Sequence, residues 1–294
     1  MLGRFDLEVL AVVGRHAAIL TARPGTRILS SPGASFAAMP APALRPLSAG
    51  EILDVSFQLY RRHFGPLAMV ALICSGFPVL LSLFIESAGG MFANPGLALV
   101  YYLVLAALSA IATGATVFIV SESYLGRPLR AGEALSRATP LIWRLLVCSI
   151  MLAVFVAIGF VFLIVPGVIL ACGLVLAFPT LVLEPGATPT RALARSWKLT
   201  QGWRLRMFGL MLTLLVLLYI PLIAIGAVAA LVLPVSAPSG SPTTVAVMAI
   251  AIVGVVQVLI YPLFYCVLTI TYYDLRVRKE GFDLEVLASI LQPA

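Results

Sequence analysis

The chain has 294 residues, of which 62% are hydrophobic and 11% are charged, and its formal net charge is +7. Soluble domains are about half apolar and a quarter charged, and a chain of this length cannot build a core large enough to bury the excess. The composition therefore excludes an ordinary soluble domain and predicts a membrane protein that crosses the bilayer several times.

Residues 1–44 contain the heptapeptide FDLEVLA at 5–11, which recurs at 282–288. The rest of this segment is rich in Ala, Pro, Gly and Ser without clear periodicity, as is typical of linkers and disordered regions. It lacks the compact apolar core and cleavage site of a signal peptide. We expect residues 1–44 to be disordered, or to be upstream sequence included by a wrong start site. The alternative is a genuine N-terminal segment that pairs with or imitates the C-terminal copy.

Six apolar stretches follow, each close to the roughly 20 residues that a helix needs to cross the hydrocarbon. They cover about 65–85, 97–120, 145–165, 167–183, 208–233 and 244–272. The third and fourth form one apolar run, in which Val165-Pro166-Gly167 predicts a tight turn. Pro179 is expected to kink the fourth near its end. The sequence thus predicts an all-α polytopic membrane protein with six transmembrane helices arranged as three hairpins.

A repeated motif precedes these hairpins. RPLSAGEIL at 45–53 and RPLRAGEAL at 127–135 agree at seven of nine positions, and ATPTRALARSWKL at 187–199 is a weaker third copy. Internal repeats of this kind indicate repeated structural units. We predict three units, each a cytoplasmic amphipathic helix followed by a transmembrane hairpin. Together they form a six-helix membrane domain over residues 45–289 that ends in a short cytoplasmic helix.

Local signals define two of the amphipathic helices. Ser48 and Glu51 have the spacing of a capping box, in which each side chain satisfies a free backbone N–H at the other end of the first turn. An apolar stripe at helical spacing follows: Leu53, Phe57, Tyr60 and Phe64. This helix is therefore predicted to lie in the membrane interface. In the third copy, Thr188 is the expected cap, Pro189 fits the first helical position, and Gly202 is the expected stop.

The distribution of basic residues predicts the orientation. All 19 Lys and Arg residues lie before the first span, between the second and third, between the fourth and fifth, or after the sixth. Because short cytoplasmic connections are enriched in Lys and Arg, both termini are predicted to be cytoplasmic. The low Lys and high Ala content is typical of a GC-rich bacterial genome.

Residues that could carry a reaction are scarce. The two histidines, His16 and His63, have no plausible catalytic partner nearby in the sequence, and zinc motifs, phosphate-binding loops and nucleophile elbows are missing. The four cysteines lie inside apolar runs without paired spacing, which is typical of packing residues. We expect a protein that is not an enzyme, with no catalytic residue, no metal site, no cofactor and no nucleic-acid partner.

Five basic residues between the fourth and fifth spans are the candidate contacts for lipid headgroups. They are Arg191, Arg195, Lys198, Arg204 and Arg206. Each basic residue close to an anionic membrane surface gains about 1 kcal/mol. The competing interpretation is that these charges only keep the connection on the cytoplasmic side.

Two features lie within the predicted spans. Gln257 is the one side-chain amide deep in a span, and we favour an interhelical hydrogen bond over a contact with a transported substrate. Ala106, Ala110 and Gly114 recur every four residues, a spacing at which small residues let helices approach closely. We interpret them as packing positions inside the bundle, with dimerisation as the alternative.

Three blocks carry a resemblance to a known family. RPLSAGEILDVSFQLYRRHFG, VPGVILACGLVLAFPTLVLEPGATPTRALARSWKLTQGWR and TYYDLRVRKEGFDLEVL occur in this order over about residues 45–289. They resemble the membrane domain family named after glycerophosphoryl diester phosphodiesterases. The resemblance implies a six-helix bundle in the bacterial cytoplasmic membrane. In some members the bundle is joined to a phosphodiesterase domain, which has no counterpart in this sequence.

We therefore expect an integral membrane protein without its own catalytic site, acting as an accessory or partner-recruiting module linked to phospholipid headgroups. Its expected partners are anionic lipids at the cytoplasmic face and a cytoplasmic or membrane protein. The alternative is an uncoupled lipid or small-solute carrier that uses a cavity between the hairpins. Spans without ionisable residues argue against an ion-coupled pump.

Overall fold

The computed structural model describes residues 45–87, 94–236 and 242–281. The described chain is helical and contains no strand, which confirms the all-α prediction. Residues Leu47–Tyr273 form the larger of two compact units, and the described residues 274–281 belong to the smaller one. The predicted disordered segment 1–44, the predicted C-terminal helix and both copies of FDLEVLA lie outside the described residues.

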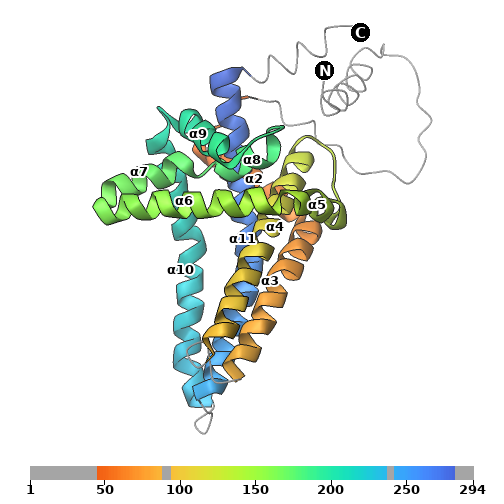
Figure 1. Cartoon of the computed structure of the whole chain (residues 1–294), viewed down its shortest axis with the longest axis vertical. Coiled ribbons are helices and arrows are strands. Elements are labelled where there is room, and N and C mark those ends of the chain that lie inside the picture. The colour runs from red at the N-terminus through yellow and green to blue at the C-terminus, as the bar shows by residue number, and fades with distance from the viewer. Residues whose placement is uncertain (1–44, 88–93, 237–241, 282–294) are drawn as a thin grey trace, which may run out of the picture. The chain divides into compact units, whose positions relative to one another are not determined.

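The helices follow one another with a short helix ahead of each group of longer ones (Figure 1). The first group is α2 (Ala49–Arg62), α3 (Phe64–Ser87) and α4 (Pro95–Tyr124). The second is α5 (Ala131–Ala138), the short η1 (Thr139–Leu141), α6 (Ile142–Phe162), α7 (Ile164–Leu174) and α8 (Ala177–Leu183). The third is α9 (Pro189–Thr200), α10 (Arg204–Ser236) and α11 (Pro242–Glu280).

Four helical stretches of the described chain are long and apolar enough to cross a membrane. They are Phe64–Ile85, Pro95–Tyr124, Ala131–Phe162 and Ile164–Leu183. Their length and composition indicate a membrane protein, in agreement with the prediction from composition.

The two closest copies of the repeated motif begin their helices at the same position but with different caps. In the first, the Glu51 backbone N–H donates to Ser48 Oγ at 3.2 Å. The Ser48 backbone N–H donates to Glu51 Oε2 at 2.7 Å, which confirms the capping box. In the second copy, Arg130 takes the N-cap position of α5 and its side chain makes no cap. The serine therefore stabilises only the first of the two helix starts.

α9 begins and ends where the sequence predicts. Thr188 accepts a hydrogen bond from the Arg191 backbone N–H at 3.4 Å, and Pro189 is the first helical residue. Gly202 follows the helix with a φ of 85°, in the left-handed region that favours glycine.

The side of α2 that packs against the rest of the protein differs from the side that carries the predicted aromatic stripe. Ile52 and Ser56 are buried, whereas Phe57 is 49% exposed and Phe64, at the start of α3, is 41% exposed. One side of α2 therefore packs against the rest of the larger unit, which also half-buries Tyr60, and the neighbouring side with Phe57 faces the surroundings. This is the distribution expected for a helix at a membrane interface.

α6 and α7 form a hairpin whose link is the single residue Leu163, in extended conformation. The turn predicted at 165–167 is therefore displaced. Pro166 lies in the first turn of α7, where its missing N–H removes no helical hydrogen bond. The two helices approach closely at glycines, because a Cβ on Gly159 would lie 2.9 Å from the Gly167 Cα.

The kink predicted near Pro179 is a break in the helix. α7 ends at Leu174, and α8 begins at Ala177. Pro179 has no N–H to donate to the carbonyl of Val175, four residues earlier, and its ring would clash with that carbonyl in a continuous helix. The break leaves carbonyl groups at the end of α7 available to other partners.

α4 packs against α3, α5, α6 and α8. A Cβ on Gly114 would lie 3.0 Å from Leu145 Cδ1 and 3.1 Å from Ala138 Cβ. Ala110 is also buried, whereas Ala106 is exposed. Two of the three small residues thus serve packing within the bundle, as predicted.

Hydroxyl groups join α4 to α11. Thr113 Oγ1 donates to Tyr265 Oη at 3.2 Å and is also hydrogen-bonded to Tyr261. Farther along, Ser121 Oγ lies 2.7 Å from Tyr273 Oη. Polar groups on apolar helices need partners inside the protein, so these contacts position α11 against α4.

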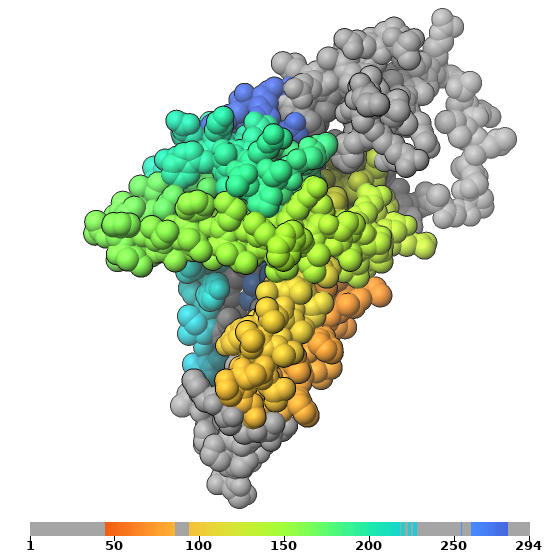
Figure 2. Space-filling model, viewed as in Figure 1, coloured from red at the N-terminus to blue at the C-terminus, as the bar shows by residue number. Residues whose placement is uncertain are grey.

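The α6–α7 hairpin runs crosswise to α3, α4 and α10 (Figure 1). It forms a green band across this face of the molecule (Figure 2). Large apolar side chains cover its end, including Val161, which is 84% exposed, and Phe162 and Ile164. An exposed apolar surface of this extent marks contact with lipid or another protein.

Replacing Ser48 with Ala removes one half of the capping box and is expected to destabilise the start of α2 by about 1 kcal/mol. Hydrogen–deuterium exchange of detergent-solubilised protein should then show faster exchange in the first turn of α2. Ser136→Ala is the control, because the Ser136 hydroxyl donates to the Glu133 carbonyl and caps no backbone N–H. Equal protection of α2 in both variants would contradict the capping role of Ser48.

Candidate functional site

Three of the five predicted lipid contacts lie on α9. Two side chains of α9 are hydrogen-bonded to one backbone carbonyl of α7. Ser196 Oγ donates to the Gly173 carbonyl at 2.9 Å, and Thr200 Oγ1 donates to the same oxygen at 3.0 Å. This carbonyl is one of the last four of α7, which have no partner within their own helix. Both hydroxyl-bearing residues are buried, so the two hydrogen bonds fix α9 to α7.

Trp197 fills the space beside the same glycine. A Cβ on Gly173 would lie 2.5 Å from Trp197 Cε3, so only glycine leaves room for the indole ring. The Arg204 guanidinium carbon, from the start of α10, lies 3.7 Å from the centre of the Trp197 ring, which is a cation–π contact. We call these three residues the Trp197 stack. It connects α7, α9 and α10.

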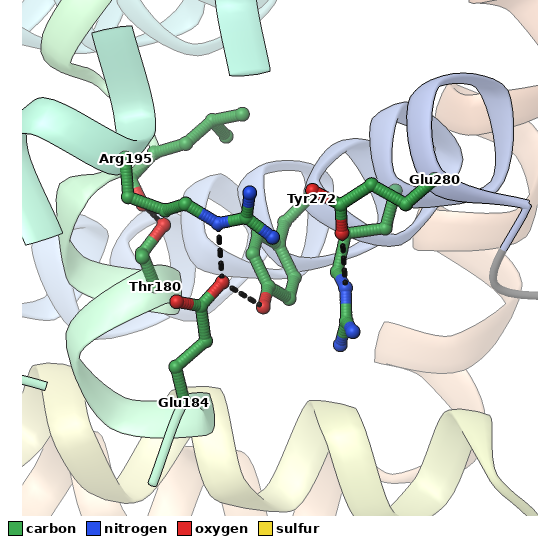
Figure 3. A network of polar contacts seen from close by, with 7 residues as sticks. Thr180, Glu184, Arg195, Tyr272 and Glu280 are labelled. Carbon is green, nitrogen blue, oxygen red and sulfur yellow. Dashed lines mark hydrogen bonds and ion pairs between the residues drawn. The ribbon is translucent and has the colours of Figure 1, made fainter. Parts of the chain in front are cut away.

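Glu184, directly after α8, gathers a second set of contacts (Figure 3). Its Oε1 atom accepts hydrogen bonds from Arg195 Nε at 2.9 Å and from Tyr272 Oη at 3.1 Å. Tyr272 is fully buried on α11. Glu184 therefore joins α9 to α11, and the charge of Arg195 is paired within the protein.

The other four basic candidates lie in different surroundings. Arg191 and Lys198 are exposed on α9. Arg204 belongs to the Trp197 stack, and Arg206 donates to the carbonyl of Leu47, ahead of α2. The five residues predicted as one site thus divide into two exposed charges on α9 and three that connect helices. The sequence does not reveal this division, because it depends on how separate helices pack against one another.

A cavity of about 500 Å³ lies between α6, α7, α10 and α11. Its wall includes Val156 from α6, Val168 from α7, Phe208 and Met211 from α10, and Leu268 from α11. The volume falls within the roughly 300–1,000 Å³ of typical ligand pockets. Because these wall side chains are apolar, the cavity suits an apolar ligand.

Hydroxyl groups on the cavity wall are already engaged. The Ser149 hydroxyl donates to the Leu146 carbonyl at 2.8 Å, and the Tyr265 hydroxyl is hydrogen-bonded to Thr113. A cavity was expected only as part of the carrier alternative, and none of these wall residues was predicted to line it. Each contributes to an ordinary apolar stretch of its own helix, so no local signal distinguishes it.

Two further predictions concern Gln257 and metal binding. Gln257 lies on α11, in a part of the helix whose side chains the structure does not describe, so its interhelical hydrogen bond stays a prediction. Within the described residues, no group of three or more His, Cys, Asp or Glu side chains is arranged to hold a metal ion.

No protein-family model matches the chain, and no curated protein or solved structure matches it either. The resemblance to the membrane domain family is therefore carried by the sequence blocks alone.

Replacing Gly173 with Ala tests the Trp197 stack. The added Cβ must displace the indole ring, so we expect a loss of about 1–3 kcal/mol of stability from overpacking. Thermal unfolding in detergent measures it, and the Trp197 emission should shift in a Trp143→Phe, Trp203→Phe background. Gly209→Ala on α10 is the control, because a Cβ there meets nothing within 4 Å.

The control should have the opposite sign, since Ala in place of Gly stabilises a helix interior by about 0.5–1 kcal/mol. A Gly173→Ala protein as stable as the parent, with unchanged Trp197 emission, would show that the close approach is not required.

Proposed function

We propose that this chain is an accessory or partner-recruiting module of a bacterial cytoplasmic membrane, which binds anionic phospholipid headgroups through the exposed basic face of α9. In this proposal it belongs to the membrane domain family that its sequence resembles, and it has no catalytic site of its own. Membrane-embedded helices are supported by the apolar stretches in the described residues. The proposed binding of headgroups rests on the exposed basic face of α9.

One observation supports headgroup binding most directly: the attachment of a basic helix to an apolar hairpin. The Gly173 carbonyl and Trp197 hold α9 against α7, whose neighbour α6 presents apolar side chains to the surroundings. Arg191 and Lys198 on α9 are therefore fixed close to an apolar surface. Basic side chains next to a hydrocarbon boundary are favourably placed for anionic headgroups.

The proposed topology keeps both termini cytoplasmic, with six apolar segments in the membrane. α10 and α11 contain 33 and 39 residues, more than the roughly 20 that a span requires. We propose that they cross the bilayer together with α3 and α4. The α6–α7 pair runs crosswise to α3 and α4, which favours a hairpin embedded along the membrane. The alternative is the predicted arrangement of six full spans.

Cysteine labelling separates these topologies. In a variant without the four native cysteines, Leu163→Cys should resist a membrane-impermeant maleimide from both sides if the hairpin lies in the hydrocarbon. Ser239→Cys, between α10 and α11, should be labelled from the outside in intact cells. Labelling of residue 163 from the outside would instead establish six full spans.

A second candidate function is an uncoupled lipid or small-solute carrier. The cavity between α6, α7, α10 and α11 is the observation that favours it. Translocation of a fluorescent phospholipid analogue in proteoliposomes distinguishes a carrier from a module, because a module leaves the analogue in its original leaflet.

Neutralising the exposed charges of α9 tests the proposed function. Arg191→Gln with Lys198→Gln should lower the enrichment of phosphatidylglycerol over phosphatidylcholine in the purified protein, measured by lipid mass spectrometry. At about 1 kcal/mol for each of the two charges, the expected loss is roughly 30-fold. Arg195 stays unchanged, because it is paired with Glu184.

Arg61→Gln with Arg62→Gln is the matched control, since it removes two exposed charges from the end of α2. An equal loss in both variants would show general surface attraction without a site on α9. No loss in either would contradict headgroup binding altogether.

A further inference from the structure

We infer that the cavity between α6, α7, α10 and α11 holds an acyl chain of one anionic glycerophospholipid, whose phosphate is bound by Arg204. This inference rests on the proposed function, because it requires the start of α10 to face lipid headgroups. It goes beyond that function by assigning one lipid to a defined pocket and by separating Arg204 from the exposed charges of α9.

The spacing of residues along α10 places Arg204 at one end of the cavity. Phe208, Met211, Leu212 and Leu215 line the cavity and lie four, seven, eight and eleven residues after Arg204. In a helix, these positions share one face. The lined part of α10 extends over about 10 Å. The arginine therefore lies one turn beyond the wall, at the end from which α10 begins.

The wall formed by α7 leads to the same arginine. Cys172 and Val175 line the cavity on either side of Gly173 in the sequence. Gly173 contacts Trp197, and the Trp197 ring carries the Arg204 guanidinium at 3.7 Å. The α7 and α10 walls thus each continue along the chain into a residue of the Trp197 stack, which itself lies outside the lining. A ligand with an apolar chain and one polar end would place that end beside Arg204.

Arg204 has unused capacity for an anion. Its Nε atom is buried and has no hydrogen-bond partner among the described residues. A guanidinium carries five N–H donors and binds phosphate oxygens in a forked geometry. Arg204 is also the first residue of α10, where the helix dipole disfavours a cation and favours an anion. A phosphate beside the guanidinium would offset the unfavourable charge.

The apolar wall selects the rest of the ligand. The hydroxyls of Ser149 and Tyr265 are engaged within the protein, so the described wall offers contacts suited to hydrocarbon. In a membrane-embedded unit, the molecules that combine a phosphate with acyl chains are the phospholipids of the surrounding leaflet. Only one chain needs to enter, and the second can stay in the bilayer.

Fluorescence quenching tests the pocket. The probe is phosphatidylglycerol with brominated acyl chains, titrated in detergent into the full chain carrying Trp143→Phe and Trp203→Phe, so that Trp197 is the remaining tryptophan. We expect saturable quenching at one lipid per protein. Brominated phosphatidylcholine should bind roughly fivefold or more weakly, because it lacks net negative charge.

Three variants in this background identify the site. Ala153→Phe adds a ring to the cavity wall on α6 and should abolish saturable quenching. Val161→Phe, on the same helix but outside the cavity wall, should leave it unchanged. Arg204→Gln should weaken phosphatidylglycerol roughly fivefold or more and remove its preference over phosphatidylcholine. If Ala153→Phe does not fold, Ala171→Leu fills the cavity from the α7 wall.

Unchanged quenching in a folded cavity-filling variant would overturn the inference, and so would equal affinity for the two lipids in the parent protein. Arg191→Gln with Lys198→Gln keeps the two proposals distinguishable. If this variant retains saturable quenching but loses headgroup enrichment, both proposals hold. If enrichment is also unaffected, the proposed role of α9 fails and the pocket remains. Lost saturable quenching in this variant would contradict the assignment of the phosphate to Arg204.

Discussion

Large apolar side chains cover the outside of α3, α6 and α10, and an apolar environment makes that surface favourable. This requirement governs the rest of the structure. With no water at that depth, polar groups on the same helices need partners inside the protein. The hydroxyls between α4 and α11 meet this demand, as does the Gly173 carbonyl, which accepts from two buried side chains.

Gly173 links the apolar and basic parts of the larger unit. It lies close to the break that Pro179 imposes, so its carbonyl is open to partners outside α7. Its missing side chain admits Trp197, and the indole in turn supports Arg204. One backbone position therefore connects the hairpin, the basic helix α9 and the start of α10. Cys172, the neighbour of Gly173 in the chain, lines the cavity, so α7 contributes both to the attachment of α9 and to the wall of the proposed lipid pocket.

Features set by local rules were predictable from the sequence. The capping box of Ser48 and Glu51 and the bounds of α9 each follow from a few neighbouring residues. Pro179 predicted a kink, and the structure has a break before it. The position of the link in the tight α6–α7 hairpin was less predictable. Pro166 is typical of a turn, yet it is equally compatible with the first turn of a helix, and the close approach of Gly159 and Gly167 places the link at Leu163.

The candidate site was predictable only in part. A cluster of basic residues is visible in the sequence, but the pairing of Arg195 with Glu184 and the contact of Arg204 with Trp197 depend on tertiary packing. The crosswise course of α6 and α7 has the same origin, because apolar composition sets the solvent that a helix prefers but not its direction.

The α6–α7 hairpin also bears on how the protein is assembled. From Leu145 to Leu183 the chain contains no charged residue, and its only link is the apolar Leu163. Such a pair can enter the bilayer from the side where it is synthesised without carrying a charge through the hydrocarbon, since a charge at the membrane centre costs several kcal/mol. Its insertion should therefore draw nothing from the membrane potential, unlike a segment whose connecting loop must translocate charge.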